Sequence, residues 1–228
     1  MIRKFTVIRH ILVALLMVFL QDALVAQNAE VWEEAIQQFE QEDKQNPPPK
    51  GAVLFAGSSS IRMWQSLQDD FPGVTTINRG FGGSQMSDLN HFIDRIVLPY
   101  EPAMIFVYEG DNDIAAGKSP EEVLKDFQTF VERVHSNMPD TPIGFIAIKP
   151  STARWNLASD MRKANEMVRQ FTLWKPNLEF IDTFSAMLGP DGYPREELLL
   201  DDGLHMTGAG YELWTKIITP YIQLTTQN

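Results

Sequence analysis

The stretch AVLFAGSSSIR, residues 52–62, joins a short apolar run to a glycine and three serines. Ala52–Ala56 has the length and composition of a strand that is buried on both faces. Gly57 permits a tight turn, and the serines after it favour the start of a helix, where a hydroxyl is exposed and backbone N–H groups face any anion. Taken alone, Ser58 or Ser59 as a simple helix N-cap is the favoured interpretation.

Similar apolar runs recur on the C-terminal side of this stretch. They are Val74–Asn78, Ala103–Tyr108, Pro142–Ile148 and Leu178–Ile181. Segments with helical spacing of apolar residues separate them, and a last helical segment follows from Tyr211 to Ile222. Strand–helix alternation of this kind predicts a three-layer α/β/α sandwich around a five-stranded parallel sheet.

Composition narrows the possible functions of the chain. The 228 residues are 44% apolar and 21% charged, which suits a globular domain with a sizeable core. The net charge is −11 and no run of Lys and Arg occurs, so a nucleic-acid partner is excluded. The chain has no cysteine, which rules out disulfides, thiol catalysis and lipoprotein attachment.

The N-terminal segment has the pattern of a signal peptide. Basic residues precede an unbroken apolar run at 11–20, which is shorter than the roughly 20 residues that span a bilayer. We therefore expect a signal peptide over residues 1–26, cleavage near Ala26 and a periplasmic or secreted protein without stable membrane insertion. An uncleaved N-terminal anchor is the alternative.

Residues 27–50 form a second region, ahead of the main domain, which is expected over 51–228. Val31, Ile36 and Phe39 recur at helical spacing in an acidic, Gln-rich stretch, which predicts a short amphipathic helix. The prolines at 47–49 end that helix and act as a linker, because proline cannot continue a helix.

Functional groups of parallel sheets collect at the carboxyl ends of the strands, so the loops there carry the most information. Residues 78–84 form one such loop, NRGFGGS. A dinucleotide-binding fingerprint fails because Gln85 stands where its last glycine belongs. Backbone N–H groups in such a loop can approach a ligand and suit an oxyanion hole. A plain glycine-rich connector is the alternative.

Two further strand-end segments carry polar groups. In Gly110-Asp111-Asn112-Asp113 the acids do not meet the spacing of a calcium loop, and Asn112 is a side-chain donor. A solvated turn is the alternative there. Near the C-terminus, Asp202 precedes His205 by three residues across a glycine, so its carboxylate can orient the imidazole. His91 and His135 lie within helical patterns, which leaves His205 as the base for serine chemistry.

Together these segments resemble the SGNH hydrolase superfamily, also called GDSL-like lipases or acylhydrolases, in a bacterial exported subgroup. The resemblance covers residues 52–221. Its blocks are Gly57-Ser58-Ser59, Gly83, Gly110-Asp111-Asn112-Asp113 and the pair Asp202 and His205. Ser58 stands where the family commonly has Asp, so Ser58 and Ser60 remain alternative nucleophiles.

The resemblance implies a flavodoxin-like fold and assigns a role to each block residue. Ser59 is the nucleophile, with Asp202 and His205 completing a Ser-His-Asp triad. The backbone N–H groups of Ser59 and Gly83, with the Asn112 side chain, form the oxyanion hole. The implied activity is an esterase that needs no metal and no organic cofactor, and it should fall in acid as His205 becomes protonated.

The substrate is less defined by the sequence. Polar and aromatic residues at strand ends could contact an acylated sugar; they are Arg79, Glu109, Lys149, Arg154 and Trp155. Ordinary salt-bridged loop residues are the alternative for this set. We expect a small-molecule or glycan ester, with O-acetyl groups preferred. A lysophospholipase or thioesterase, an O-acyltransferase, a non-catalytic glycan-binding domain and a flavodoxin-like cofactor binder are the competing hypotheses.

Overall fold

The computed structural model describes residues 30–226, and the predicted signal peptide lies outside them. Its strands are β1 (Val53–Gly57), β2 (Thr76–Gly80), β3 (Met104–Tyr108), β4 (Ile143–Ile146) and β5 (Leu178–Ile181). They form one parallel sheet in the order β2-β1-β3-β4-β5. Each strand overlaps one of the predicted apolar runs, although β1 ends one residue and β2 two residues later than predicted. The predicted five-stranded parallel sheet is therefore confirmed.

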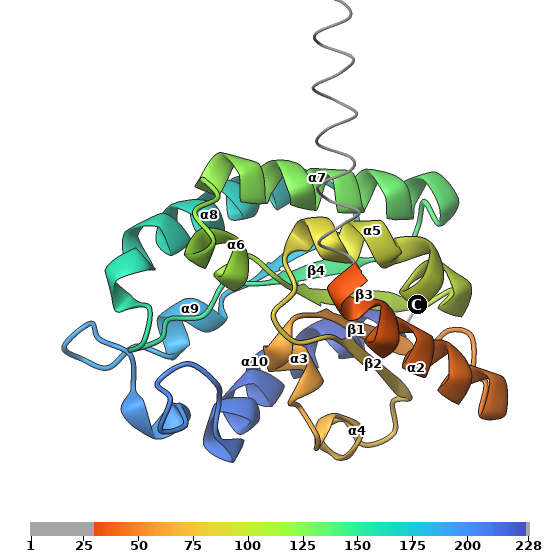
Figure 1. Ribbon diagram of the computed structural model, residues 1–228, viewed down its shortest axis with the longest axis horizontal. Coiled ribbons are helices and arrows are strands. Elements are labelled where there is room, and N and C mark those ends of the chain that lie inside the picture. The colour runs from red at the N-terminus through yellow and green to blue at the C-terminus, as the bar shows by residue number, and fades with distance from the viewer. Residues whose placement is uncertain (1–29, 227–228) are drawn as a thin grey trace, which may run out of the picture.

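Helices cover both faces of the sheet. The α-helices are α2 (Glu33–Gln45), α3 (Ser59–Arg62), α4 (Leu67–Asp70), α5 (Met86–Ile96), α6 (Asp111–Ala115), α7 (Pro120–Asn137), α8 (Ala158–Thr172), α9 (Thr183–Ala186) and α10 (Gly208–Thr226). The 3₁₀ turns are η1 (Glu30–Trp32), η2 (Leu98–Tyr100), η3 (Trp155–Leu157) and η4 (Glu196–Leu198). In Figure 1, α5, α7 and α8 lie on one side of the sheet and α3 and α10 on the other. No helix within residues 30–226 is long and apolar enough to cross a bilayer.

Successive side chains along the strands alternate between two hydrophobic cores, one on each face of the sheet. On β1, Leu54 and Ala56 join the core beneath α5, α7 and α8, whereas Val53 and Phe55 join the core beneath α10. Every residue of β1 is buried, as expected for a central strand of a parallel sheet. The three-layer α/β/α class predicted from the sequence is therefore confirmed.

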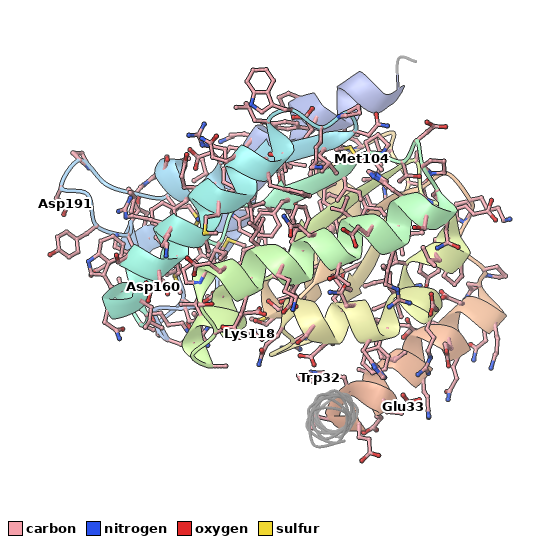
Figure 2. The ribbon with its side chains drawn as sticks, turned by 90° about the horizontal axis from the view of Figure 1, so that it is seen from above. Trp32, Glu33, Met104, Lys118, Asp160 and Asp191 are labelled. Carbon is pink, nitrogen blue, oxygen red and sulfur yellow. The ribbon has the colours of Figure 1, made fainter. Side chains whose placement is uncertain are left out.

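Helix α2 is the outermost helix of its layer. Figure 2 shows α8, α7, α5 and α2 side by side above the sheet. Ile36 buries its side chain completely, and Arg95 of α5 holds the helix from the side through hydrogen bonds of 2.7 and 3.0 Å to Glu33 and 2.6 Å to Glu40. The helix ends at Gln45, just before the prolines.

The strand order places the site. Chain connections run outward in opposite directions from β1 and β3, so a crevice opens at the carboxyl ends of these two central strands. The loop after β1 carries Ser59, and the loop after β3 carries Asp111 and Asn112. Two of the candidate blocks therefore meet at the crevice.

Gly57 closes β1 in a conformation that only glycine adopts easily. Its φ is 142°, and a Cβ at this position would lie 2.1 Å from the Tyr108 carbonyl oxygen of the neighbouring strand. Such an overlap with backbone cannot relax through a side-chain rotation, so β1 and β3 can approach this closely only because residue 57 lacks a side chain.

Gly57→Ala should accordingly lower the free energy of unfolding by about 3 kcal/mol or more, as measured by urea denaturation. Gly73→Ala is a matched control, because Gly73 also has a positive φ, 83°, but has nothing within 4 Å of an added Cβ. We expect the control to cost about 1 kcal/mol, from backbone strain alone. Equal losses in the two variants would contradict the close-approach explanation.

Candidate active site

Ser59 is the one serine of its block that faces the crevice. It is the first residue of α3, two positions after the end of β1. Ser58 and Ser60 each keep only 2% of their surface exposed, and the Ser60 carbonyl accepts a hydrogen bond of 3.0 Å from the Tyr211 hydroxyl of α10. The fold thus buries both neighbours of Ser59.

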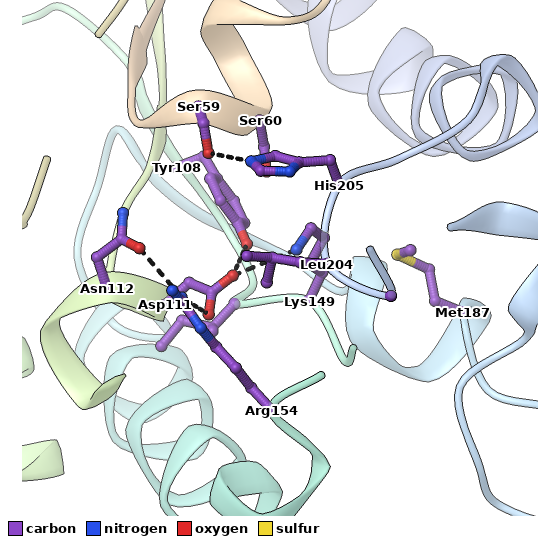
Figure 3. Close-up of polar contacts among 12 residues, drawn as sticks. Ser59, Ser60, Tyr108, Asp111, Asn112, Lys149, Arg154, Met187, Leu204 and His205 are labelled. Atoms are coloured by element: carbon purple, nitrogen blue, oxygen red, sulfur yellow. Dashed lines mark hydrogen bonds and ion pairs between the residues drawn. The ribbon is translucent and has the colours of Figure 1, made fainter. Parts of the chain in front are cut away.

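A chain of hydrogen bonds links Ser59 to the loop before α10 (Figure 3). His205 Nε2 lies 3.0 Å from Ser59 Oγ. His205 Nδ1 lies 2.6 Å from Asp202 Oδ2. The other Asp202 oxygen accepts the backbone N–H groups of Leu204 at 2.8 Å and His205 at 2.9 Å. These bonds fix the loop so that the imidazole stands between carboxylate and hydroxyl.

The hydrogen bonds of this chain orient the imidazole so that it can accept a proton from serine. The hydrogen bond from His205, followed by those from the backbone N–H groups of Leu204 and His205, holds the pKa of Asp202 well below its usual range. Asp202 is therefore an anion that accepts the Nδ1–H of His205. With that proton on Nδ1, Nε2 presents its lone pair to the Ser59 hydroxyl.

Asn112 stands in α6, just after β3, with its amide fixed at both ends. Its Nδ2 donates to the Ser84 carbonyl at 2.9 Å, and its Oδ1 accepts from Arg154 Nη1 at 3.0 Å. Figure 3 shows Asn112 and Ser59 on facing sides of the site. The second Nδ2 hydrogen has no partner within residues 30–226, so one amide hydrogen is free for a ligand.

Two backbone donors complete this group. Gly83 has a φ of 83° in the turn after β2, directly beside the Ser84 carbonyl that Asn112 holds. In the described part of the chain, the N–H groups of Gly83 and Ser59 have no acceptor. The structure thus brings Ser59, Asn112, Asp202 and His205 to one site, with Gly83 next to Asn112.

Arg154 and Lys149 share a buried carboxylate. Asp111 Oδ1 accepts from Arg154 Nη1 at 2.6 Å and Asp111 Oδ2 from Lys149 Nζ at 3.2 Å. Burial by itself would raise the pKa of Asp111, but the two cations outweigh it and lower the pKa. Lys149 is 1% exposed and so does not reach a substrate, whereas Arg154 remains partly exposed. Sequence reasoning missed this use of Asp111.

The acidic residues of this region bind cations of the protein. Asp113 pairs with Lys118 at 2.9 Å and accepts the Met86 backbone N–H. Across residues 30–226, no three His, Asp or Glu side chains are grouped so that they could hold a metal ion.

Arg79 does not join the site. Its guanidinium packs between the rings of Phe39 and Tyr100 and bonds to Asp43 of α2 and to the Tyr100 hydroxyl. The side chain points from β2 toward the α2 layer, away from the crevice. The predicted substrate contact of Arg79 is therefore corrected: this residue fastens α2 to the sheet.

Glu109 is also withdrawn from any substrate, because it is fully buried behind the 81–84 loop. Ser84 Oγ lies 2.6 Å from Glu109 Oε1 and 2.9 Å from the Phe81 carbonyl, and one hydroxyl proton can serve only one acceptor. A protonated Glu109 supplies the second proton. Desolvation, followed by repulsion from Asp113, raises the pKa of Glu109 well above its usual range, which agrees with the neutral form.

Glu109 should make stability fall as pH rises. Above its ordinary pKa of 4.5, the unfolded chain loses this proton while the folded chain keeps it. The free energy of unfolding therefore falls by at most about 1.4 kcal/mol per pH unit. Glu109→Gln keeps a neutral amide there and removes this dependence. Urea denaturation of both proteins between about pH 5 and 8 should show the parent losing stability relative to the variant. Parallel profiles would contradict a protonated Glu109.

Trp155 lies at the rim of the site, half-buried. Its ring packs against Tyr193, with centroids 5.2 Å apart, and Tyr193 is 58% exposed. Tyr193 belongs to the loop 188–197, which with Thr152 lines a surface cavity of about 760 Å³. Thr152 Oγ1 donates to the Gly203 carbonyl at 3.2 Å, so the cavity adjoins the loop of Asp202 and His205. Sequence reasoning missed Tyr193, which lies in a Gly- and Pro-rich loop without a motif.

Comparisons with known proteins agree with this fold. A protein assigned as a platelet activating factor from Streptococcus pneumoniae matches with a TM-score of 0.74 and 23% identity, over 87% of this chain and 98% of that one. A protein assigned as an acylhydrolase from Bacteroides fragilis matches with a TM-score of 0.72 and 22% identity, over 83% and 96%. A carbohydrate esterase family 3 protein from Talaromyces cellulolyticus matches with a TM-score of 0.62 and 16% identity, over 78% and 99%. No curated protein sequence matches.

The match to a family of lipases and acylhydrolases defines the chain as an enzyme that hydrolyses ester bonds. The family is equally clear, since the model of the GDSL-like Lipase/Acylhydrolase family matches residues 48–213, more than half of the chain. The chain belongs to this family. The resemblance to SGNH hydrolases seen in the sequence is thereby confirmed.

Proposed function

We propose that this protein is an exported serine esterase that cleaves carboxylic esters through Ser59, His205 and Asp202. The observation that carries the proposal is the unbroken hydrogen-bond chain from Asp202 through His205 to Ser59, with bonds of 2.6 and 3.0 Å. Both distances allow proton transfer without rearrangement.

In the first half of the reaction, His205 Nε2 takes the Ser59 proton as Oγ attacks the ester carbonyl carbon. The resulting oxyanion accepts hydrogen bonds from the Ser59 and Gly83 N–H groups and from Asn112. His205 then returns its proton to the departing alcohol, and an acyl-enzyme remains. In the second half, His205 removes a proton from water, the hydroxide attacks the acyl carbonyl, and Ser59 recovers its proton as the acid leaves.

The surface next to the triad points to small esters on a carbohydrate. The cavity of about 760 Å³ beside Thr152 has room for sugar rings, and Trp155 with Tyr193 offers aromatic faces at its edge. Arg154 keeps a partly exposed guanidinium near Asn112 and can donate to hydroxyl groups. The fold match to a carbohydrate esterase is a further support. O-acetyl groups are the proposed target.

Release of nitrophenol from acetyl, butyryl and longer acyl esters tests the proposal, followed by release of acetate from acetylated glycans. We expect the acetyl ester to be cleaved fastest and acetate to be released from a glycan. Preference for long acyl chains, or for a lysophospholipid over every glycan, would show that the substrate is a lipid and not a carbohydrate. Absence of any Ser59-dependent hydrolysis would refute the esterase.

Export is proposed on the N-terminal pattern alone, a basic start followed by the apolar run at 11–20. N-terminal sequencing of the protein recovered from periplasm and culture medium tests it. A new terminus near residue 27 is the expected result, whereas an intact Met1 in the membrane fraction would favour the anchor.

A further inference from the structure

Trp32 touches the backbone of the loop that carries Gly83. It lies in η1, just ahead of α2, and its indole Nε1 donates to the Gly82 carbonyl at 2.8 Å across 50 residues of sequence. The indole also meets the ring of Phe81 edge-on, with centroids 6.0 Å apart and planes at 72°. Trp32 lies outside residues 48–213, which the family model matches.

The Gly82 carbonyl and the Gly83 N–H belong to one peptide unit. That unit is planar and trans, so its C=O and N–H point in opposite directions. Fixing the carbonyl on one side therefore fixes the direction of the N–H on the other. Rotating the unit changes only ψ of Gly82 and φ of Gly83, and glycine tolerates almost all such values. Without an external contact, this peptide would turn over easily.

The rest of the loop is held from the opposite end. Asn112 Nδ2 donates to the Ser84 carbonyl, while Ser84 Oγ contacts Glu109. Between the Trp32 and Asn112 contacts, the Gly83 N–H has no acceptor among residues 30–226. The unpaired Gly83 N–H thus sits between two fixed points of the turn, next to the Asn112 amide.

We propose that Trp32 is a positioning residue for the oxyanion hole: its indole N–H holds the Gly82–Gly83 peptide in the orientation that aims the Gly83 N–H at the substrate oxygen. This inference rests on the proposed function. It gives the helix outside the matched family region a role in the reaction, although Trp32 touches no reacting atom.

The helix behind Trp32 is itself fastened at several points. Arg95 bonds to Glu33 and Glu40, and Arg79 bonds to Asp43 at the far end of α2. The start of the helix, and with it the indole, is therefore fixed relative to the sheet.

Trp32→Phe tests the inference, because phenylalanine keeps a ring against Phe81 and loses only the donor. We expect kcat for nitrophenyl acetate to fall about ten- to a hundredfold with KM changed less than about twofold, since an oxyanion donor acts mainly in the transition state. Complete loss of such a donor costs about 10²- to 10³-fold, which sets the upper limit.

Two controls separate an effect on the orientation of the Gly83 N–H from a general loss of protein stability. Trp174→Phe makes the same substitution at an indole that is 86% exposed. Glu40→Gln weakens one Arg95 contact to α2, but it leaves both Arg95 bonds to Glu33 at the start of the helix and does not touch Gly82. Both should keep the parent kcat. An unchanged kcat in Trp32→Phe, or an equal fall in Glu40→Gln, would overturn the proposal.

Hydrogen exchange of the indole protons gives a readout that does not depend on hydrolysis. In the parent, the Trp32 indole N–H should exchange at least about tenfold more slowly than that of exposed Trp174, with both signals assigned from the Phe variants. Equal exchange would overturn the contact whatever the activity. A parent without Ser59-dependent hydrolysis would instead refute the esterase, so the two failures are distinguishable.

Discussion

Replacing Ser59 with alanine should lower kcat for nitrophenyl acetate by about 10⁴-fold or more, to the level left by binding and the oxyanion hole alone. The reason is geometric, because Ser59 is the one serine of its block whose hydroxyl meets His205, at 3.0 Å. Without that oxygen no acyl-enzyme forms. Steady-state hydrolysis by the purified parent and variant measures the effect.

His205→Ala should be nearly as severe, and the double variant should be no worse than either single one, because nucleophile and base act as a unit. A fluorophosphonate probe should label Ser59 in the parent and nothing in Ser59→Ala. Ser58→Ala and Ser60→Ala should stay within about tenfold of the parent, since both side chains are buried. Labelling of Ser58 or Ser60 would instead identify that serine as the nucleophile.

Asn112→Ala should lower kcat about 10²- to 10³-fold and leave KM nearly unchanged. The Asn112 amide is oriented before any substrate arrives, by the Ser84 carbonyl on its nitrogen and Arg154 on its oxygen. A donor fixed in this way stabilises the developing oxyanion without having to reorganise. The measurement is kcat and KM for the acetyl ester.

Asn165→Ala is the matched control for Asn112. Asn165 is another asparagine with its amide fixed at both ends, since it bonds to both backbone groups of Ile148, at 2.8 and 2.9 Å. We expect this control to lose stability in urea but to retain kcat in the folded protein. A comparable fall in kcat would show that Asn112 acts through structure alone.

The fold was predictable from the sequence because its strands are short, continuous apolar runs. Phe55 and Phe106 illustrate this, since each is fully buried at the centre of a predicted strand. The strand order was not predictable in the same way. Apolar runs show that a strand is buried on both faces, but they do not show which strand is its neighbour.

The site was predictable where its chemistry is local in the chain. Asp202 and His205 are three residues apart, and their hydrogen bond follows from that spacing. Arg79, Glu109 and Lys149 were placed at the correct edge of the sheet, but their residue types did not show that partners within the protein bind them. Arg79 bonds to Asp43, Glu109 to Ser84 and Lys149 to Asp111.

Trp32 shows a different limit. Its hydrogen bond partner is a backbone carbonyl 50 residues away, and backbone groups leave no trace in residue types. An indole at the start of an amphipathic helix indicates packing in general, but it does not identify the peptide that it contacts.

The distance along the chain between Ser59 and His205, 146 residues, has a consequence for biosynthesis. Trp214 of α10 packs against Trp64 after α3, and Tyr211 stacks on the same ring at 5.2 Å. This packing of α10 brings His205 next to Ser59. A chain emerging from the ribosome can form every strand while its serine still lacks a base. The nascent polypeptide is therefore inactive, and it becomes reactive only when its final segment has folded.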